Sequence, residues 1–324
     1  MVKAIRIEET GGPEVLKYVD VEVGDPGEGQ VRLKQTAIGL NYIDVYHRTG
    51  LYPVEPPLVI GMEAAGEVIA TGPGVTDLAV GDRVAYATPP LGAYAEERLI
   101  PANRVVKLPD AIDDKTAAAM MLQGMTVEYL IRRTYPVKPG DTVLWQAAAG
   151  GVGLMACQWL KHIGATVIGT AGSEEKCALA KAHGADHVIN YREENFAEKV
   201  KEITDGKGVP VVYDGVGKDT WEGALDCLQP RGLMVTFGNA SGPVPPVNLG
   251  ILSAKGSLYV TRPTLMTYTA SRSDLVESAS ALFDVVTKGA LKIEVNQTYP
   301  LSETEQAHRD LEARKTTGST VILP

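Results

Sequence analysis

Residues 1 to about 124 mix apolar and polar positions at the short intervals that are typical of β-strands in a half-buried sheet. The stretches "VRLKQTAIGL" (31–40) and "DRVAYA" (82–87) place β-branched and other apolar residues between polar ones. Clusters of Gly, Pro, Asp and Thr separate such stretches, among them "TGGPE", "GDPGEGQ", "TGPGVTD" and "TPPLG", and these are turn signals. The pattern predicts an irregular β-barrel or sandwich.

Beyond about residue 124 the pattern changes to short apolar runs that alternate with segments of helical spacing. Helical spacing begins in "TVEYLIRRTY" (126–135) and stops at Pro136. The predicted strands are "TVLWQA", "TVIGTA", "DHVINY", "PVVYDGV", "LMVTFG" and "SLYVTR". The predicted helices are "GVGLMACQWLKHIG", "SEEKCALAKAHG", "NFAEKVKEIT" and "TWEGALDCLQ". Apolar strands followed by amphipathic helices predict a doubly wound parallel α/β sheet of the dinucleotide-binding type.

From about residue 263 the chain adds a helix, a strand and a last helix, in "SRSDLVESASALFDVVTKG", "KIEVNQTYPL" and "SETEQAHRDLEARK". This piece is too short to form a domain, so we expect it to pack back onto the first region. The expected organisation is therefore a β-rich domain over 1–124, a nucleotide-binding domain over 125–262 and a returning segment over 263–324.

The strongest local motif is "TVLWQAAAGGVGLMACQWLK" (142–161), where a strand runs into a glycine-rich turn that opens a helix. Ala148, Gly150 and Gly153 occupy the three positions of G-x-G-x-x-G, and only the first is replaced, by the next smallest residue. Such a turn lets the backbone approach a diphosphate and lets the helix pack close to its strand. The free N–H groups at the helix N-terminus are then expected to bind the diphosphate. Gly151 and Val152 are expected to take part with Gly150 and Gly153.

The end of the second predicted strand indicates which dinucleotide is bound. NAD-binding sheets usually carry an acidic residue there for the ribose hydroxyls, but this chain has "AGSEEK" (171–176). Without the carboxylate a 2′-phosphate is not repelled, and Ser173 and Lys176 offer donors to bind it. Glu174 and Glu175 are expected to face solvent at the helix N-terminus. The pattern favours NADP(H) over NAD(H).

Composition and charge narrow the class of protein. Of 324 residues, 44% are hydrophobic and 22% charged, as in a globular protein with ample core. No apolar run approaches the roughly 20 residues that span a bilayer, and "MVKAIRIEETGG" is unlike a signal peptide. The net charge of −9 argues against nucleic-acid binding. The cysteines, Cys157, Cys177 and Cys227, form no C-x-x-C pair, so we expect buried thiols and a reducing cytoplasm.

These features together resemble the medium-chain dehydrogenase/reductase superfamily, and within it the zinc-free quinone oxidoreductases that include zeta-crystallin. The resemblance covers the whole chain. Its most specific part is "GDTVLWQAAAGGVGLMACQWLK" (140–161), which matches that group's Gly-Asp, a Leu, small residues, Gly-Gly-x-Gly, then Gln and Lys. The resemblance implies a GroES-like catalytic domain, formed by the first region and the tail, and a Rossmann NADPH-binding domain with the active site between them.

The stretch "LVIGMEAAGEV" (58–68) departs from the zinc enzymes of that superfamily. Their comparable stretch is Gly-His-Glu-x-x-Gly-x-Val, in which the His binds zinc, whereas this chain has Met62 before Glu63. The superfamily's catalytic cysteine position falls near Asn41. A thioether is a poor zinc ligand, and the four-cysteine structural lobe is absent because no cysteine precedes residue 157. We therefore expect neither a catalytic nor a structural zinc ion, and we discard the hypothesis of a zinc alcohol dehydrogenase.

The resemblance also implies roles for particular residues. Asn41, Tyr46 and Tyr52 are expected beside the nicotinamide, where either tyrosine could hydrogen-bond a substrate oxygen. The expected cofactor-binding residues are Asn41, Thr126, Ala148, Gly150, Gly151, Val152, Gly153, Ser173, Lys176, Tyr191, Phe237, Gly238, Asn239 and Arg314. Arg262 is a weaker candidate. Each tyrosine could instead be a packing residue, and Glu63 is favoured as a structural acid that hydrogen-bonds backbone.

Without a Lewis acid, the chemistry that remains is hydride delivery to an already activated electrophile. The first hypothesis is NADPH-dependent quinone reduction by a homodimer that pairs through "SLYVTRP" (257–263). The second replaces the quinone by an α,β-unsaturated ketone or aldehyde. The third is a non-enzymatic, crystallin-like NADPH-binding protein, and no membrane or nucleic-acid partner is expected. His183 and His187 are not expected to bind metal, because Gly184 breaks the helix between them. His47 is favoured as a surface or packing residue over a proton shuttle.

Overall fold

The computed structural model describes residues 1–324, and the chain folds into two compact units. The first comprises residues 1–125, 268–287 and 293–324, and the second comprises 126–267 and 288–292. Residues 263–267 and 288–292, which the sequence assigns to the returning segment, thus fall in the second unit. No helix is long and apolar enough to cross a membrane.

The first unit is built around two sheets. Its strands are β1 (Val2–Ile7), β2 (Lys17–Val21), β3 (Gln30–Leu40), β4 (Leu58–Val59), β5 (Glu63–Thr71), β6 (Arg83–Tyr86), β7 (Glu97–Pro101), β8 (Val106–Lys107), β15 (Val295–Pro300) and β16 (Ser319–Leu323). One sheet has the order β2-β1-β4, and the other has the order β15-β16-β3-β5-β6-β8, with β7 also paired to β3. The inward positions of β3, from Val31 to Leu40, are buried together with β5 and β6 in one apolar core, as strand periodicity requires.

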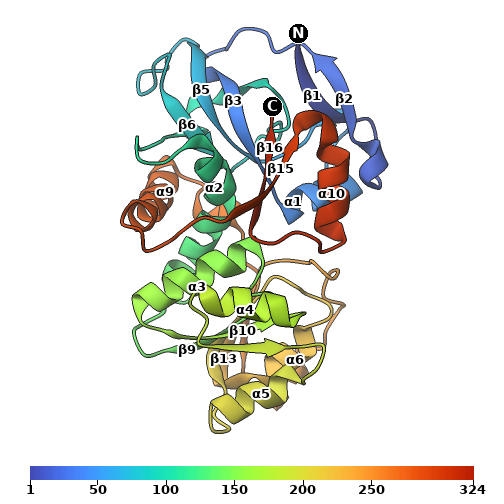
Figure 1. Cartoon of the computed structure of the whole chain (residues 1–324), viewed down its shortest axis with the longest axis vertical. Helices are drawn as coiled ribbons and strands as arrows, with labels where there is room; N and C mark the ends of the chain where they lie inside the picture. The colour runs from blue at the N-terminus through green and yellow to red at the C-terminus, as the bar shows by residue number, and fades with distance from the viewer. The chain divides into compact units, whose positions relative to one another are not determined.

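The tail of the chain completes this larger sheet. Strand β16 pairs antiparallel with β3, with Thr320 opposite Leu40, and parallel with β15. The strand β15 and the last helix agree with the predicted elements, whereas β16 was not predicted, because "STVIL" follows the charged segment "EARKTTG" with no clear alternation. Figure 1 shows β15, β16 and α10 of the C-terminus packed among the N-terminal strands.

Two helices occupy positions in the first region where the sequence pattern predicts only strands: α1 (Tyr42–Thr49) and the first part of α2 (Asp114–Tyr129), which continues as a π-helix over Leu130–Thr134. Further along the chain are α8 (Leu265–Tyr268), α9 (Arg272–Thr287) and α10 (Thr304–Glu312), and of these α9 and α10 agree with the predicted helices. Short 3₁₀ helices span Pro13–Val15, Ala102–Arg104 and Leu301–Glu303. The β-rich prediction was wrong for 114–125, since α2 is apolar almost all round and buried, which removes the amphipathic period that identifies a helix.

The second unit confirms the predicted doubly wound sheet. Its strands are β9 (Thr142–Trp145), β10 (Thr166–Ala171), β11 (His187–Asn190), β12 (Val209–Asp214), β13 (Leu228–Thr236) and β14 (Tyr259–Thr261). Their order is β11-β10-β9-β12-β13-β14, and every neighbouring pair is parallel. From β9 the chain first adds β10 and β11 on one side of the sheet and then β12, β13 and β14 on the other side. The strand order thus reverses between β9 and β12, and such sheets bind their ligands at this reversal.

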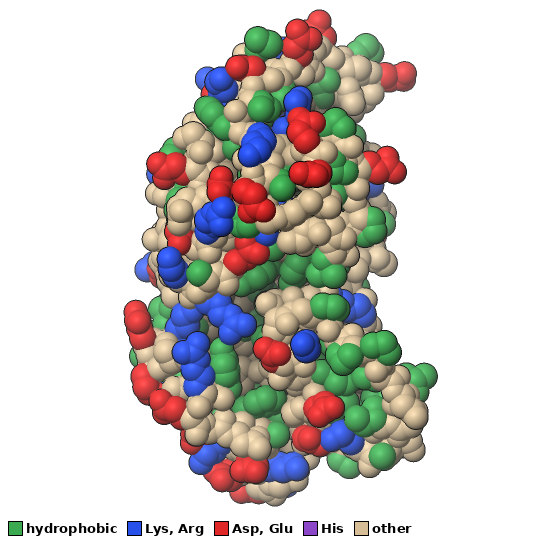
Figure 2. Space-filling view, turned by 90° about the vertical axis from the view of Figure 1, so that its right-hand side faces the viewer, with side chains coloured by type: hydrophobic (Ala, Val, Ile, Leu, Met, Phe, Trp, Pro, Cys, Tyr) green, Lys and Arg blue, Asp and Glu red, His purple; other side chains and the backbone are tan.

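The helices of the second unit cover both faces of its sheet (Figure 1). They are α3 (Gly151–Ile163), α4 (Glu174–Ala182), α5 (Phe196–Ile203), α6 (Trp221–Asp226) and α7 (Gly250–Ala254). An apolar core joins α5 and α6 to Leu144, Val212 and Met234 of the central strands. The three cysteines are buried free thiols, as predicted. The face in Figure 2 carries acidic side chains but also a local gathering of Lys and Arg, so the negative net charge is not evenly spread.

Candidate active site

The glycine-rich turn of the second unit leads into helix α3, whose N-terminus has no side-chain cap. Gly150 is the N-cap of α3 in an extended conformation, and no side chain caps the helix. The turn is fixed by hydrogen bonds from Ala148 N to Thr170 O (2.9 Å) and from Gly150 N to Ala147 O (3.0 Å). The first-turn N–H groups of a helix have no intrahelical acceptor. These N–H groups, at the carboxyl end of β9, are suited to binding an anion.

The predicted glycines contribute in two different ways. A Cβ on Gly153 would lie 2.5 Å from Ala147 O and 2.6 Å from Ala148 O, so this position admits no side chain. A Cβ on Gly150 would meet only Ala147 O, at 3.4 Å, so space lies open beside it. Gly153 thus allows α3 to pack on its strand, while Gly150 leaves room for a ligand. The turn fits the diphosphate of a dinucleotide.

Ser173 and Tyr191 lie together at the ends of β10 and β11. Ser173 caps α4, and its Oγ accepts a hydrogen bond from Lys176 N (3.3 Å). The Tyr191 hydroxyl lies over Gly172, where a Cβ would come within 2.5 Å of it. Asn190 Nδ2 donates to Glu174 Oε1 (3.2 Å), and both Glu174 and Glu175 are exposed. Two hydroxyl groups, of Ser173 and Tyr191, therefore lie next to Gly172, just after β10.

Phe237, Gly238 and Asn239 follow β13 at the same edge of the sheet. Phe237 packs on Trp145, with ring centroids 5.7 Å apart, and its N–H donates to Asp214 O (2.8 Å). Arg262 holds this turn from the end of β14, because its Nη1 donates to Gly238 O (2.9 Å) and Thr236 Oγ1 (3.2 Å). Arg262, a weaker candidate for phosphate binding, is thus engaged with the protein's own backbone. Thr126 is buried in α2.

Asn41 is the centre of a buried polar cluster in the first unit. It is the N-cap of α1, and its backbone N–H donates to Asp44 Oδ2 (2.9 Å) in a capping box. Its side-chain Nδ2 donates to Glu63 Oε2 (2.6 Å), and its Oδ1 accepts from Gln123 Nε2 (3.0 Å). Asn41 is only 5% exposed. Its amide is therefore fixed from both ends, inside the protein.

The two positions that would hold zinc in related enzymes do not offer a zinc site. Met62 is completely buried, and the Asn41 amide is engaged as described. No group of three or more His, Cys, Asp or Glu side chains is arranged to hold a metal ion. An amide and a thioether are poor zinc ligands, so the donors present do not fit this metal.

Glu63 is the structural acid that the sequence favours. Its Oε1 accepts from Leu122 N (2.8 Å), which confirms the expected backbone hydrogen bond. Burial raises the pKa of Glu63 to about 8, against the hydrogen bonds from Leu122 and Asn41. Burial likewise raises the pKa of Asp44 to about 7, against hydrogen bonds from Asn41 and the Tyr94 hydroxyl. The cluster thus keeps carboxyl protons at a pH where exposed carboxyls are ionised.

Tyr46 and Tyr52 form one aromatic wall. Their ring centroids are 5.2 Å apart at an interplanar angle of 63°, and Tyr52 N donates to Tyr46 O (3.1 Å). His47 lies edge-on to Tyr52, at 6.0 Å between centroids, and burial lowers the pKa of His47 to about 4. Its buried Nδ1 has no hydrogen-bond partner. Tyr46 is buried and Tyr52 is half-buried, so at neutral pH this part of the chain forms a neutral, aromatic cluster.

The predicted residues divide between the two units. Asn41, Tyr46, Tyr52 and Arg314 belong to the first unit, where Arg314 follows α10 and its charge acts on Tyr42. The remaining predicted residues belong to the second. Sequence reasoning missed Asp44, Arg48, Tyr94, Gln123, His308 and Ser319, which contact one another or Asn41. They come from distant segments, and only the Asn-x-x-Asp spacing of Asn41 and Asp44 was a readable signal, that of a capping box.

Comparison with known proteins gives consistent matches over the whole chain. The alcohol dehydrogenase GroES-like domain family matches residues 27–110, and the zinc-binding dehydrogenase family matches residues 151–283. A quinone oxidoreductase of Pseudomonas aeruginosa is 56% identical, with 100% of both chains covered. A 2-haloacrylate reductase of a Burkholderia species is 50% identical, covering 100% of this chain and 99% of its own. The structure of an Escherichia coli quinone oxidoreductase complexed with NADPH has a TM-score of 0.97 at 51% identity, covering 99% of this chain and 100% of its own.

Proposed function

This chain belongs to the quinone oxidoreductases of the medium-chain dehydrogenase/reductase superfamily, and we propose that it reduces quinones with NADPH and without a metal ion. As a member it is an oxidoreductase with a GroES-like and a Rossmann unit. The observation that carries the metal-free part is the Asn41 amide, held between Glu63 and Gln123 beside the buried Met62.

NADPH is the cofactor, since the Escherichia coli relative is a complex with NADPH and the second unit has the residues to hold it. The amides at Gly151, Val152 and Gly153 bind the diphosphate, and Gly150 leaves the space for it. Ser173, Lys176 and Tyr191 surround the 2′-phosphate, and Phe237 to Asn239 receive the nicotinamide side. When bound, NADPH supplies the hydride.

The protein's own contribution is to position an acceptor that is already electrophilic. The aromatic wall of Tyr46 and Tyr52 offers flat, neutral rings to a quinone, and a tyrosine hydroxyl can donate to the oxygen that gains charge. His47, kept neutral by burial, places no positive charge beside this wall. A quinone needs no Lewis acid to accept hydride, which agrees with a polar cluster that fits no zinc ion.

We also propose that the enzyme is a cytoplasmic homodimer. Strand β14 is an edge strand of the second sheet, and Tyr259 on it is 61% exposed. An edge of this kind can pair with its copy across a two-fold axis. The three free buried thiols suit a reducing compartment. Light scattering of the purified chain decides the oligomeric state, and a monomer at micromolar concentration contradicts this part.

The decisive experiment measures initial rates of 1,4-benzoquinone reduction with NADPH and with NADH, each with and without a chelator. We expect a rate that the chelator does not change and that is faster with NADPH. Loss of the rate on chelation contradicts the metal-free reaction. A preference for NADH contradicts the 2′-phosphate site but leaves the fold unaffected.

A second candidate is the reduction of an alkene conjugated to a carbonyl group. It is favoured by the 2-haloacrylate reductase, which shares half of its residues with this chain. Turnover of 2-chloroacrylate and of methyl vinyl ketone, measured beside 1,4-benzoquinone, separates the candidates. A higher kcat/KM for either alkene than for the quinone makes the alkene class the better description.

A further inference from the structure

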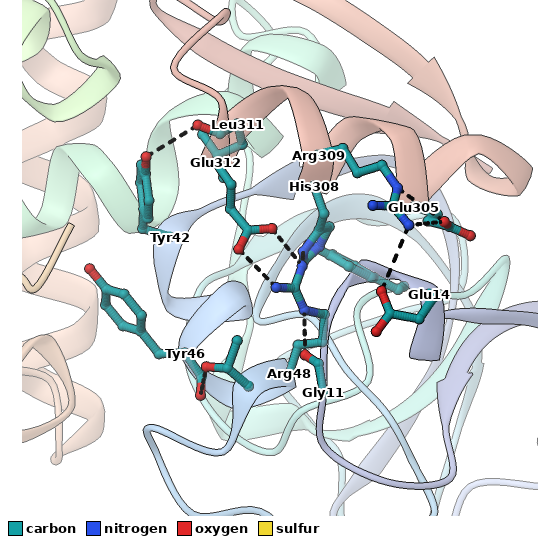
Figure 3. A network of polar contacts seen from close by, with 12 residues as sticks. Gly11, Glu14, Tyr42, Tyr46, Arg48, Glu305, His308, Arg309, Leu311 and Glu312 are labelled. Atoms are coloured by element: carbon teal, nitrogen blue, oxygen red, sulfur yellow. Dashed lines mark hydrogen bonds and ion pairs between the residues drawn. The ribbon is translucent and has the colours of Figure 1, made fainter. Parts of the chain in front are cut away.

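The last helix of the first unit, α10, is joined to α1 through a buried arginine. Arg48 is only 1% exposed. Its guanidinium donates to both carboxylate oxygens of Glu312, at 2.9 Å each, to His308 Nδ1 at 3.1 Å and, from Nε, to Gly11 O at 3.1 Å. Tyr42 at the start of α1 donates to Leu311 O (3.1 Å). Figure 3 shows these contacts converging on α1 from α10.

The arginine fixes the tautomer of His308. A guanidinium only donates hydrogen bonds, so Nδ1 of His308 is the acceptor and carries no proton. Burial, together with the charge of Arg48, lowers the pKa of His308 to about 3, so the ring is neutral. The single ring proton is therefore on Nε2, which donates to the Tyr94 hydroxyl (3.1 Å). Tyr94 in turn donates to Asp44 Oδ2 (2.9 Å).

These hydrogen bonds form a series in which each residue donates to the next, and the series begins and ends on α1. It runs from Arg48 through His308 and Tyr94 to Asp44, and Asp44 caps the N-terminus of α1 while Arg48 lies in its last turn. One buried imidazole of α10 thus holds both ends of α1. Helices as short as these eight residues are not stable on their own, so the orientation of α1 depends on such contacts.

Helix α1 carries the aromatic wall of the proposed quinone site. Tyr46 is on α1 and Tyr52 follows it, with its backbone N–H bonded to Tyr46 O. In Figure 3 the Tyr46 ring points away from the Arg48 guanidinium. Neither Arg48 nor His308 is exposed, so both act on a substrate only through the helix. Burying an ion pair contributes little net stability but does favour one geometry.

We propose that His308 and Arg48 are positioning residues for substrate binding, which fix α1 so that Tyr46 and Tyr52 keep the geometry that a quinone requires. This inference rests on the proposed function. It assigns a role in the reaction to α10, the last helix of the chain.

Four proteins test it: the wild type, His308→Leu, His308→Gln and Arg309→Lys. Leucine removes both hydrogen bonds, whereas the glutamine amide can still donate toward Tyr94. Arg309 is the matched control, because it lies on α10 but forms exposed ion pairs with Glu305 (2.7 Å) and Glu14 (3.7 Å), away from α1 (Figure 3). KM and kcat are measured for 1,4-benzoquinone and for the wider 9,10-phenanthrenequinone, with NADPH affinity measured separately.

We expect His308→Leu to raise the quinone KM about tenfold while kcat and NADPH affinity stay within about twofold. His308→Gln should recover part of the loss, and Arg309→Lys should match the wild type. As a readout without turnover, hydrogen exchange of the peptide spanning 42–52 should be faster in His308→Leu only. An unchanged KM, with kcat reduced in proportion to the folded fraction, overturns the inference, and so does unchanged exchange in that peptide.

A wild type that reduces neither quinone contradicts the proposed function rather than this inference. The same variants are then compared on methyl vinyl ketone. A KM that rises in His308→Leu supports the positioning role for that substrate, and a KM equal in all four proteins overturns it.

Discussion

The two units form their candidate sites from different chemical groups, the second from the backbone and the first from side chains. In the second unit the phosphate-binding turn consists of backbone N–H groups and of glycines whose value is the side chain they lack. In the first unit the cluster around Asn41 consists of side chains, including two carboxyls that are completely buried. A backbone site depends on local conformation, whereas a side-chain site depends on partners from distant segments. The two sites should therefore respond differently to substitution and to pH.

The largest contrast is expected at the glycines of the second unit. Gly153→Ala forces a methyl group against two carbonyl oxygens, so we expect a loss of about 1–3 kcal/mol in stability and NADPH binding weakened by about 100-fold or more. Gly150→Ala is the matched variant, since its methyl group meets only one atom, at 3.4 Å. It should keep its stability while NADPH affinity falls. Thermal unfolding and fluorescence titration measure the two effects, and equal behaviour of the variants contradicts the separate roles.

Asn41→Leu tests the side-chain site. It removes the Asn41 partner of two buried atoms, Glu63 Oε2 and Gln123 Nε2, which costs about 2–3 kcal/mol in the free energy of unfolding. The control is Asn195→Ala, which removes the exposed N-cap of α5, with an expected loss of about 1 kcal/mol. Urea denaturation followed by tyrosine and tryptophan fluorescence compares them. If Asn41→Leu loses no more stability than the control, the hydrogen bonds of Asn41 in the buried cluster contribute little to the free energy of unfolding.

Lys176→Ala sharpens the second unit's role in choosing the cofactor. If Lys176 pairs with the 2′-phosphate, its removal should raise the KM for NADPH about tenfold and leave the KM for NADH unchanged. Lys181→Ala at the other end of α4 is the control and should change neither value. Steady-state rates with both cofactors give the result, and a parallel rise in both KM values argues against a contact with the 2′-phosphate.

The smallest expected effect is the pH dependence of stability. The pKa of His308 is about 3 in the folded chain and about 6.5 when unfolded, so its contribution is complete above pH 6.5 and is lost as the pH falls toward 3. The raised pKa values of Glu63 and Asp44 act oppositely, lowering stability as the pH rises to about 8. Between pH 6.5 and 4, His308→Gln should therefore lose less Tm than the wild type. His187→Gln, at an exposed position, should follow the wild type.

The two units also differ in how much of their structure could be predicted from the sequence. The alternation of apolar strands and helices predicts the whole second sheet, and Gly150 and Gly153 stand out because a turn of that shape tolerates little else. The contact between Arg48 and His308 joins positions 260 residues apart, and no local pattern marks either residue. A buried acid such as Glu63 can be suspected from its apolar neighbours, but its partners Asn41 and Leu122 are found only in the structure.

Strand β16 has a consequence for the order in which the chain can fold. It lies between β15 and β3, so the larger sheet of the first unit has a gap beside β3 until residues 319–323 have been synthesised. The second unit needs nothing beyond residue 292. During translation the segment made second can therefore become native first, while the N-terminal strands wait for the C-terminus with an open edge. A chain that ends at residue 292, released from the ribosome, should have a protease-resistant second unit and a protease-sensitive first one.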